Sequence, residues 1–212
     1  MGARDSVHPT RFPVYNTCTM TDAAYELNYA SNGLDVLKDY LFTKGLYWTL
    51  NLDPALGKPA SPKLTPGNLL LSFARLNAYR LGGKMDRGQE SELLKLERDF
   101  EAQRSKWAVA WEKKAAHAFD SRLRQWGYYL KEVDDNPEAQ APYYKSEVRL
   151  RVLLELLQDE LKEKPEADLS ILDGGLRPYF SPGDFIWDED LAVGFPQEKY
   201  WYLYGQLTNI SP

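Results

Sequence analysis

A single helical pattern runs without a proline from Asp86 to Val133 and constrains the fold of this chain more than any other feature. Apolar or small residues recur along it in eleven steps over the 40 residues from Leu93 to Val133, or 3.64 residues per step, when Gln103 fills one gap. This is the period of a straight α-helix rather than the 3.5 residues of a left-handed coiled coil. The sequence therefore predicts one unbroken helix, about 86–133, with its apolar side on one face.

Such a helix is longer than its own domain should be. At about 1.5 Å per residue it would span roughly 72 Å, whereas a chain of this length should form a domain about 34 Å across. We therefore expect the helix to kink or to protrude, with Gly127 as the weak point because glycine costs a helix interior about 1 kcal/mol. A protruding apolar face must be covered, either by another segment of this chain or by a partner molecule.

The remaining segments predict an all-α domain built around this helix. We expect an irregular N-terminal arm at 1–20 and a single helical domain at 21–212. An apolar helix at about 143–164 would pack antiparallel to the long helix, and glycines and prolines interrupt the aromatic-rich segment 172–212, which would form an irregular C-terminal strap.

Shorter elements are predicted at both ends of the chain. Residues 23–30 favour a helix that Ser31-Asn32-Gly33 should interrupt, and a short helix from Leu34 should end before Gly45. Thr65-Pro66 is a strong start signal for a helix that Gly82-Gly83 should end. The alternation at 46–52 leaves strand and helix open, and so does the segment 200–207. We weakly favour a short helix from Phe195 through Gly205 over a strand beside 46–52.

Composition limits the class of protein without naming a function. The net charge is −5, from 26 basic and 31 acidic residues, so no global attraction to nucleic acid or anionic membranes is implied. Cys18 is the single cysteine, which leaves no disulfide framework or cysteine-based zinc site within one chain. No transmembrane or signal segment is apparent, and we expect a cytoplasmic protein. The first six residues match the Met-Gly-x-x-x-Ser pattern for myristoylation at Gly2. The sequence does not decide between a lipidated Gly2 and an ordinary polar N-terminus.

No spacing typical of a catalytic or metal site occurs. His117 has no second histidine or glutamate at metal-ligand spacing, and Cys18 has no nearby histidine on a structured segment. The best carboxylate group lies in the strap and lacks the calcium-loop pattern: Asp184, Asp188, Glu189 and Asp190. The sequence thus predicts no catalytic residue, no metal ligand and no cofactor.

Two sets of residues are candidates for binding partners. Tryptophans suit protein interfaces because they bury a large area and keep a polar group, so the predicted partner-binding residues are Trp107, Trp111, Trp126, Trp187 and Trp201. A basic tract on the long helix could follow a phosphate backbone. Its residues are Arg104, Lys106, Lys113, Lys114, Arg122 and Arg124.

We therefore expect a non-enzymatic protein-interaction or assembly subunit, with a protein partner or a homo-oligomer. The first alternative is a helical subunit of a nucleoprotein complex that uses the basic tract. The second alternative is an unrecognised enzyme with carboxylates drawn from several helices; a pocket with several carboxylates and no compensating arginine would favour it. No motif in the chain resembles a family closely enough to transfer functional residues.

Overall fold

The computed structural model describes residues 23–52, 61–162 and 166–208. Within these ranges the helices are α1 (Ala23–Asp35), α2 (Leu37–Leu41), α3 (Pro66–Leu81), α4 (Arg87–Lys106), α5 (Ala108–Asp135), α6 (Pro137–Gln140), α7 (Tyr144–Glu147), α8 (Arg149–Gln158) and α9 (Glu166–Leu176). The strands β1 (Trp48–Thr49) and β2 (Lys63–Leu64) form one antiparallel pair, and β3 (Phe180–Phe185) and β4 (Tyr204–Leu207) form another. The prediction of an all-α domain is confirmed. The predicted N-terminal arm lies outside the described residues.

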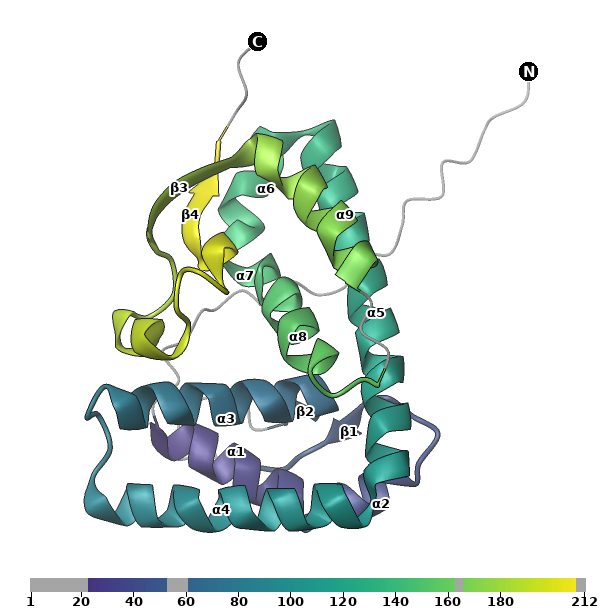
Figure 1. Cartoon of the computed structure of the whole chain (residues 1–212), viewed down its shortest axis with the longest axis vertical. Coiled ribbons are helices and arrows are strands. Elements are labelled where there is room, and N and C mark those ends of the chain that lie inside the picture. The colour runs from purple at the N-terminus through teal and green to yellow at the C-terminus, as the bar shows by residue number, and fades with distance from the viewer. Residues whose placement is uncertain (1–22, 53–60, 163–165, 209–212) are drawn as a thin grey trace.

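Helix α5 connects two tiers of structure (Figure 1). The lower tier contains α1, α3 and α4, and the upper tier contains α6 to α9 with the β3–β4 hairpin. Helix α3 packs against α1 below and α8 above. The buried apolar residues form one cluster that extends from Ala23 to Leu207. Among the described residues, no helix is both long enough and apolar enough to cross a membrane.

The predicted single helix at 86–133 is wrong, because the chain turns a corner at Trp107 (Figure 1). Trp107 takes φ −115° and ψ 30°, outside the helical region, and separates α4 from α5. The flanking hydrogen bonds persist: the Trp107 N–H donates to the Gln103 carbonyl and the Trp111 N–H donates to the Trp107 carbonyl, both at 2.9 Å. The apolar period in the sequence therefore continues through the corner. Gly127, the expected weak point, lies within α5.

The corner lets both helices bury their apolar faces within one chain. Leu93 and Phe100 of α4 are buried in the lower tier, whereas Phe119 and Trp126 of α5 are buried in the core that α5 shares with α8. A straight rod would have carried one of these faces into solvent, where each exposed large side chain forfeits about 1.5–3 kcal/mol. Tertiary burial thus outweighs the continuous local helix signal.

Other predicted boundaries also shift. Helix α1 continues through Ser31-Asn32-Gly33, because Gly33 allows close packing: a Cβ there would lie 3.2 Å from Leu64 Cδ1. The helix start at Thr65-Pro66 is confirmed, with the Thr65 hydroxyl accepting a 3.1 Å hydrogen bond from the Asn68 N–H. Gly82 follows its last residue as predicted, and Gly83 has a φ of 64° that glycine adopts without strain.

The C-terminal half is also more divided than its sequence pattern indicates. The predicted helix at 143–164 consists of α7 and α8 and ends at Gln158, although α8 does run back along α5 (Figure 1). Helix α9 extends to Leu176, so the strap begins later than residue 172. Residues 201–203 form a 3₁₀ turn and 204–207 a strand that pairs with β3, not with the 46–52 segment. The weak preference for a helix from Phe195 through Gly205 is therefore wrong.

One buried arginine attaches the strap to the helices. Arg151 of α8 donates to both carboxylate oxygens of Asp173 on α9, at 2.8 and 3.0 Å, and to Glu155 at 2.8 Å. Its guanidinium also lies 4.6 Å from the ring centroid of Tyr202. Since a buried charge requires such compensation, this network fixes α9 and the Tyr202 turn against α8.

Candidate interaction site at the helix corner

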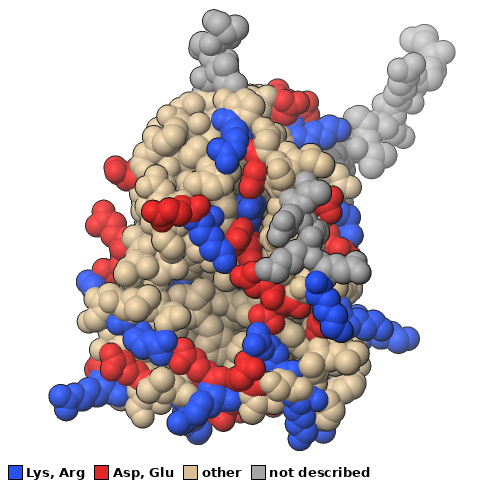
Figure 2. Space-filling view, viewed as in Figure 1, with Lys and Arg blue, Asp and Glu red and all other residues tan. Residues whose placement is uncertain are grey.

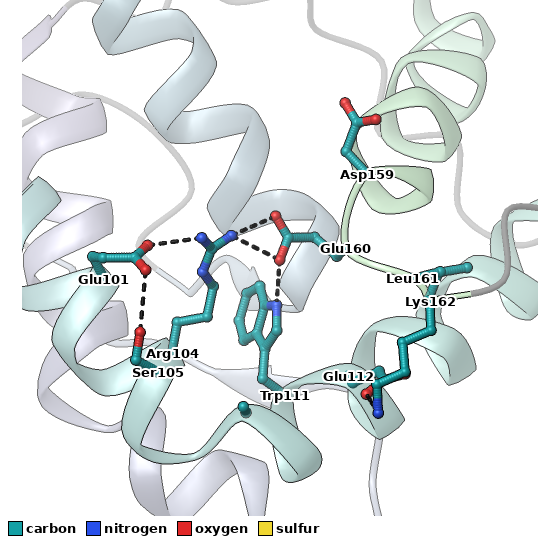
Figure 3. A pocket seen from close by; sticks show the side chains of 10 residues that line it. Glu101, Arg104, Ser105, Trp111, Glu112, Asp159, Glu160, Leu161 and Lys162 are labelled. Carbon is teal, nitrogen blue, oxygen red and sulfur yellow. Dashed lines mark hydrogen bonds and ion pairs between the residues drawn. The ribbon is translucent and has the colours of Figure 1, made fainter.

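The inner side of the corner is held by one carboxylate that is shared by both helices (Figure 3). Glu160, in the turn after α8, accepts hydrogen bonds from Arg104 Nη1 of α4 at 2.8 and 2.9 Å. The same carboxylate accepts a 2.7 Å hydrogen bond from Trp111 Nε1 of α5. Hydrogen bonds to charged groups are the stronger ones. Glu160 therefore clamps the last turn of α4 to the first turn of α5.

A cavity of about 290 Å³ lies beside this clamp, and its charged walls are already paired. Glu101 binds Arg104 at 2.7 Å, and Lys162 binds Glu112 at 2.8 Å. Figure 3 shows these side chains directed at one another around the cavity. Arg104 compensates Glu101 and Glu160, and lysines pair with the two other carboxylates, so this cavity lacks the uncompensated carboxylate group that would favour an enzyme.

The outer side of the corner exposes apolar side chains. Phe42 is 62 % exposed, Val109 is 79 % exposed, and half-buried Trp107 lies between α4 and α5 with its ring edge-on to Phe42 at 5.3 Å. The ammonium groups of Lys38 and Lys106 lie 5.9 and 5.3 Å from the Trp107 ring centroid. We call these five residues the corner patch.

A buried lysine positions Phe42 at this patch. Lys114 of α5 donates to the carbonyls of Thr43 at 2.7 Å and Gly45 at 2.9 Å, in the turn after α2. Its ammonium also lies 4.7 Å from the Tyr40 ring centroid. Burial lowers the pKa of Lys114, and the carbonyls and the ring compensate the retained charge. The turn that carries Phe42 is thereby fixed against α5.

Three of the five predicted partner-binding tryptophans are buried in this chain's own core. They are Trp111, Trp126 and Trp187. The Trp187 indole donates to the Lys145 carbonyl at 3.2 Å, and Trp126 stacks on Tyr129. The prediction is wrong for these three in this conformation, because amphipathic spacing marks a buried face but not what buries it.

The other two tryptophans are half-buried. Trp107 lies in the corner patch. Trp201 packs edge-on against Phe180 at 5.2 Å, and the guanidinium of Arg177 lies 4.4 Å from its ring centroid. Trp201 is therefore covered largely by its own strap, and Trp107 is the tryptophan that a partner can reach with exposed apolar neighbours.

The basic tract divides into structural and exposed side chains. Lys114 and Arg122 are buried, Arg122 donating to the Tyr47 hydroxyl at 3.0 Å, and Arg104 belongs to the corner clamp. Lys113 and Arg124 are exposed on one face of α5, and Lys106 is exposed at the C-terminal end of α4. Lys131, which the sequence interpretation did not include, extends this exposed face by two turns. Some side chains of the basic tract thus stabilise the tertiary structure, and the others are free to contact a partner at the surface.

Charges of both signs alternate over the face drawn in Figure 2, which has a hollow near its centre. The acidic strap residues do not converge on a common point: Asp190 pairs with Lys84 at 2.8 Å, and the Asp188 carboxylate accepts from the Asp190 N–H. In the described part of the chain, no group of three histidine, cysteine or acidic residues is arranged to hold a metal ion. His117 is exposed on α5, and Cys18 and Gly2 lie outside the described residues.

Comparison of the chain with protein-family models, curated proteins and solved structures gives no match. The function must therefore be inferred from the site itself. Sequence reasoning missed Phe42 and Val109. Val109 could have been found, since it is an apolar residue on the polar side of an amphipathic helix, whereas the exposure of Phe42 depends on the turn that Lys114 holds.

Proposed function

We propose that this protein is a non-enzymatic interaction subunit and that the corner patch is where its protein partner docks. The single observation that carries the proposal is the exposure of Phe42, whose ring lies edge-on to half-buried Trp107, together with the exposure of Val109 in the first turn of α5. Interface hot spots are typically aromatic side chains surrounded by a polar rim, and Lys38 and Lys106 supply such a rim. The lone cysteine in the sequence is consistent with a reducing compartment, and we place the subunit in the cytoplasm.

The rigidity of the patch supports this function. Glu160 fixes the angle between α4 and α5 from the inside, and Lys114 fixes the turn that carries Phe42. A preorganised patch loses less conformational entropy on binding than a mobile one. Burying a side chain such as Phe42 or Val109 against a partner contributes roughly 1.5–3 kcal/mol, so this small patch can anchor a larger interface.

The test is site-specific photo-crosslinking from position 109, followed by reconstitution with the purified partner. We expect Val109→Glu to abolish the complex, because it places a charge in the apolar contact. Ile171→Glu is the matched control, since Ile171 is 72 % exposed but lies on α9, and it should bind normally. Equal binding by both variants would refute the corner patch as the docking site.

A nucleic-acid function is the second candidate, favoured by the exposed cations on α5. Lys113, Arg124 and Lys131 of α5 recur at 11 and 7 residues, close to whole helical turns, and therefore share one face. Binding of a labelled oligonucleotide should then weaken steeply with salt. Lys113→Glu is the variant to use rather than a change at Lys114, which supports the fold. Absence of binding at low salt ends this candidate.

A further inference from the structure

A second exposed apolar surface, with acidic rather than basic neighbours, lies at the other end of α4 from the corner patch. Leu81, which ends α3, is 62 % exposed, and Val193 of the 3₁₀ turn η4 (Glu189–Gly194) is 52 % exposed. The two lie at one end of the molecule, because η4 packs on α3 so closely that a Cβ on Gly194 would lie 2.5 Å from the Ala78 Cβ, one turn before Leu81.

Acidic side chains lie in or next to the turn that carries Val193. Asp188, Glu189 and Asp190 belong to or adjoin η4, and Asp190 is paired with Lys84. Glu189 is exposed and forms no ion pair with any described residue. We call Leu81 and Val193 with Asp188 and Glu189 the end patch. Its charge is negative, whereas Lys38 and Lys106 make the corner patch positive.

The two patches lie at opposite ends of the lower tier (Figure 1). The end patch adjoins the connection between α3 and α4, and the corner patch adjoins the C-terminal end of α4. The 20 residues of α4 separate them, a distance of about 30 Å at 1.5 Å per residue. Two copies can therefore be placed end to end without their bulk overlapping.

We propose that the partner of the corner patch is the end patch of a second copy of this chain, so that the protein self-associates head to tail. This inference rests on the proposed function and names its partner. Opposite charges would direct the association, and the exposed apolar pairs would be buried. Pairing of two corner patches is disfavoured because it places Lys38 and Lys106 of both copies together. A heterologous contact of this kind closes into a ring or continues as a filament.

Self-association can be tested with the purified full chain alone, by sedimentation velocity and light scattering over a range of concentrations. We expect reversible species larger than a monomer, and weaker association as salt is raised. Val109→Glu and Leu81→Lys should each weaken association at least about tenfold, equivalent to about 1.4 kcal/mol. Ile171→Glu should associate like the unaltered chain. Circular dichroism and thermal unfolding of each variant establish that it is folded.

Mixing the two variants provides the decisive measurement. Val109→Glu keeps an intact end patch and Leu81→Lys keeps an intact corner patch, so their mixture should form a one-to-one dimer and nothing larger. A monomer at every concentration overturns the inference, and crosslinking of that monomer to another protein from position 109 would leave the proposed function standing. Loss of association in Val109→Glu but not in Leu81→Lys would show that two corner patches pair, and this too overturns the head-to-tail arrangement.

Discussion

The indole nitrogen of Trp111 lies 2.7 Å from Oε2 of Glu160, and this contact holds one side of the corner between α4 and α5. Arg104 holds the other side through the same carboxylate. The three groups come from α4, α5 and the turn after α8, so the angle of the corner is fixed by a residue about 50 positions away in sequence. Because this contact fixes the corner on its inner side, Trp107 is left partly exposed on the outer side.

Removing the clamp should destabilise the fold. We expect Glu160→Ala to lower the free energy of unfolding by about 1.5–3 kcal/mol, because it deletes a charged acceptor and leaves the Trp111 N–H without a partner. Urea denaturation with tryptophan fluorescence measures this change. Glu101→Ala is the control: Glu101 also binds Arg104 but is exposed, and an exposed ion pair contributes about 0–1 kcal/mol. An equal loss in both variants would contradict the clamp.

The adjacent residues Lys113 and Lys114 should differ strongly in their response to the same substitution. Lys114→Met leaves the carbonyls of Thr43 and Gly45 without their donor and should cost about 1–3 kcal/mol. Lys113→Met changes an exposed side chain and should remain within about 0.5 kcal/mol of the unaltered protein. Thermal unfolding at neutral pH compares the two. A tolerated Lys114→Met would show that the turn after α2 does not depend on this ammonium group.

Gly194 should be intolerant of a side chain because of its contact with α3. A Cβ at this position would lie 2.5 Å from the Ala78 Cβ and 2.9 Å from its Cα. We expect Gly194→Ala to cost about 1–3 kcal/mol through overpacking. Gly174→Ala, within α9 where a Cβ meets no atom within 4 Å, should stabilise by about 0.5–1 kcal/mol. Chemical denaturation of both variants tests whether η4 is as tightly packed on α3 as described.

The stability of the protein should fall with rising pH through the ionisation of Glu147. Burial, and then the nearby charge of Glu132, raise the pKa of Glu147 above its ordinary value of 4.5. The folded state therefore binds this proton more tightly than the unfolded state. Stability is lost as pH rises from the unfolded pKa through the folded one, and the loss persists at higher pH.

Glu147→Gln should accordingly be more stable than the unaltered protein at pH 7, and the difference should vanish below about pH 4, where the carboxyl is neutral in both states. Unfolding midpoints measured from pH 3.5 to 8 follow this difference. Glu92→Gln, at an exposed position of α4, is the control and should show no such convergence. If Glu147→Gln were more stable by the same amount at every pH, the gain in stability would come from packing and not from the ionisation of Glu147.

Local patterns in the sequence identified most of the long helices but not how they are joined. The apolar period marked the buried faces of α4 and α5, and Thr65-Pro66 marked the start of α3, because capping and amphipathicity act within a few residues. The same period could not reveal the corner, since Trp107 departs from helical geometry without shifting the register of the hydrogen bonds around it.

The candidate site was predictable only in part for the same reason. Sequence selected Trp107 and Lys106, which lie in the corner patch, but also Trp111, Lys114 and Arg122, whose partners are Glu160, the turn after α2 and Tyr47. The sequence by itself determined that most of α3, α4 and α5 is helical and which faces of α4 and α5 are apolar. Only the tertiary structure decided which tryptophans and cations are buried, because burial depends on contacts between residues far apart in the chain.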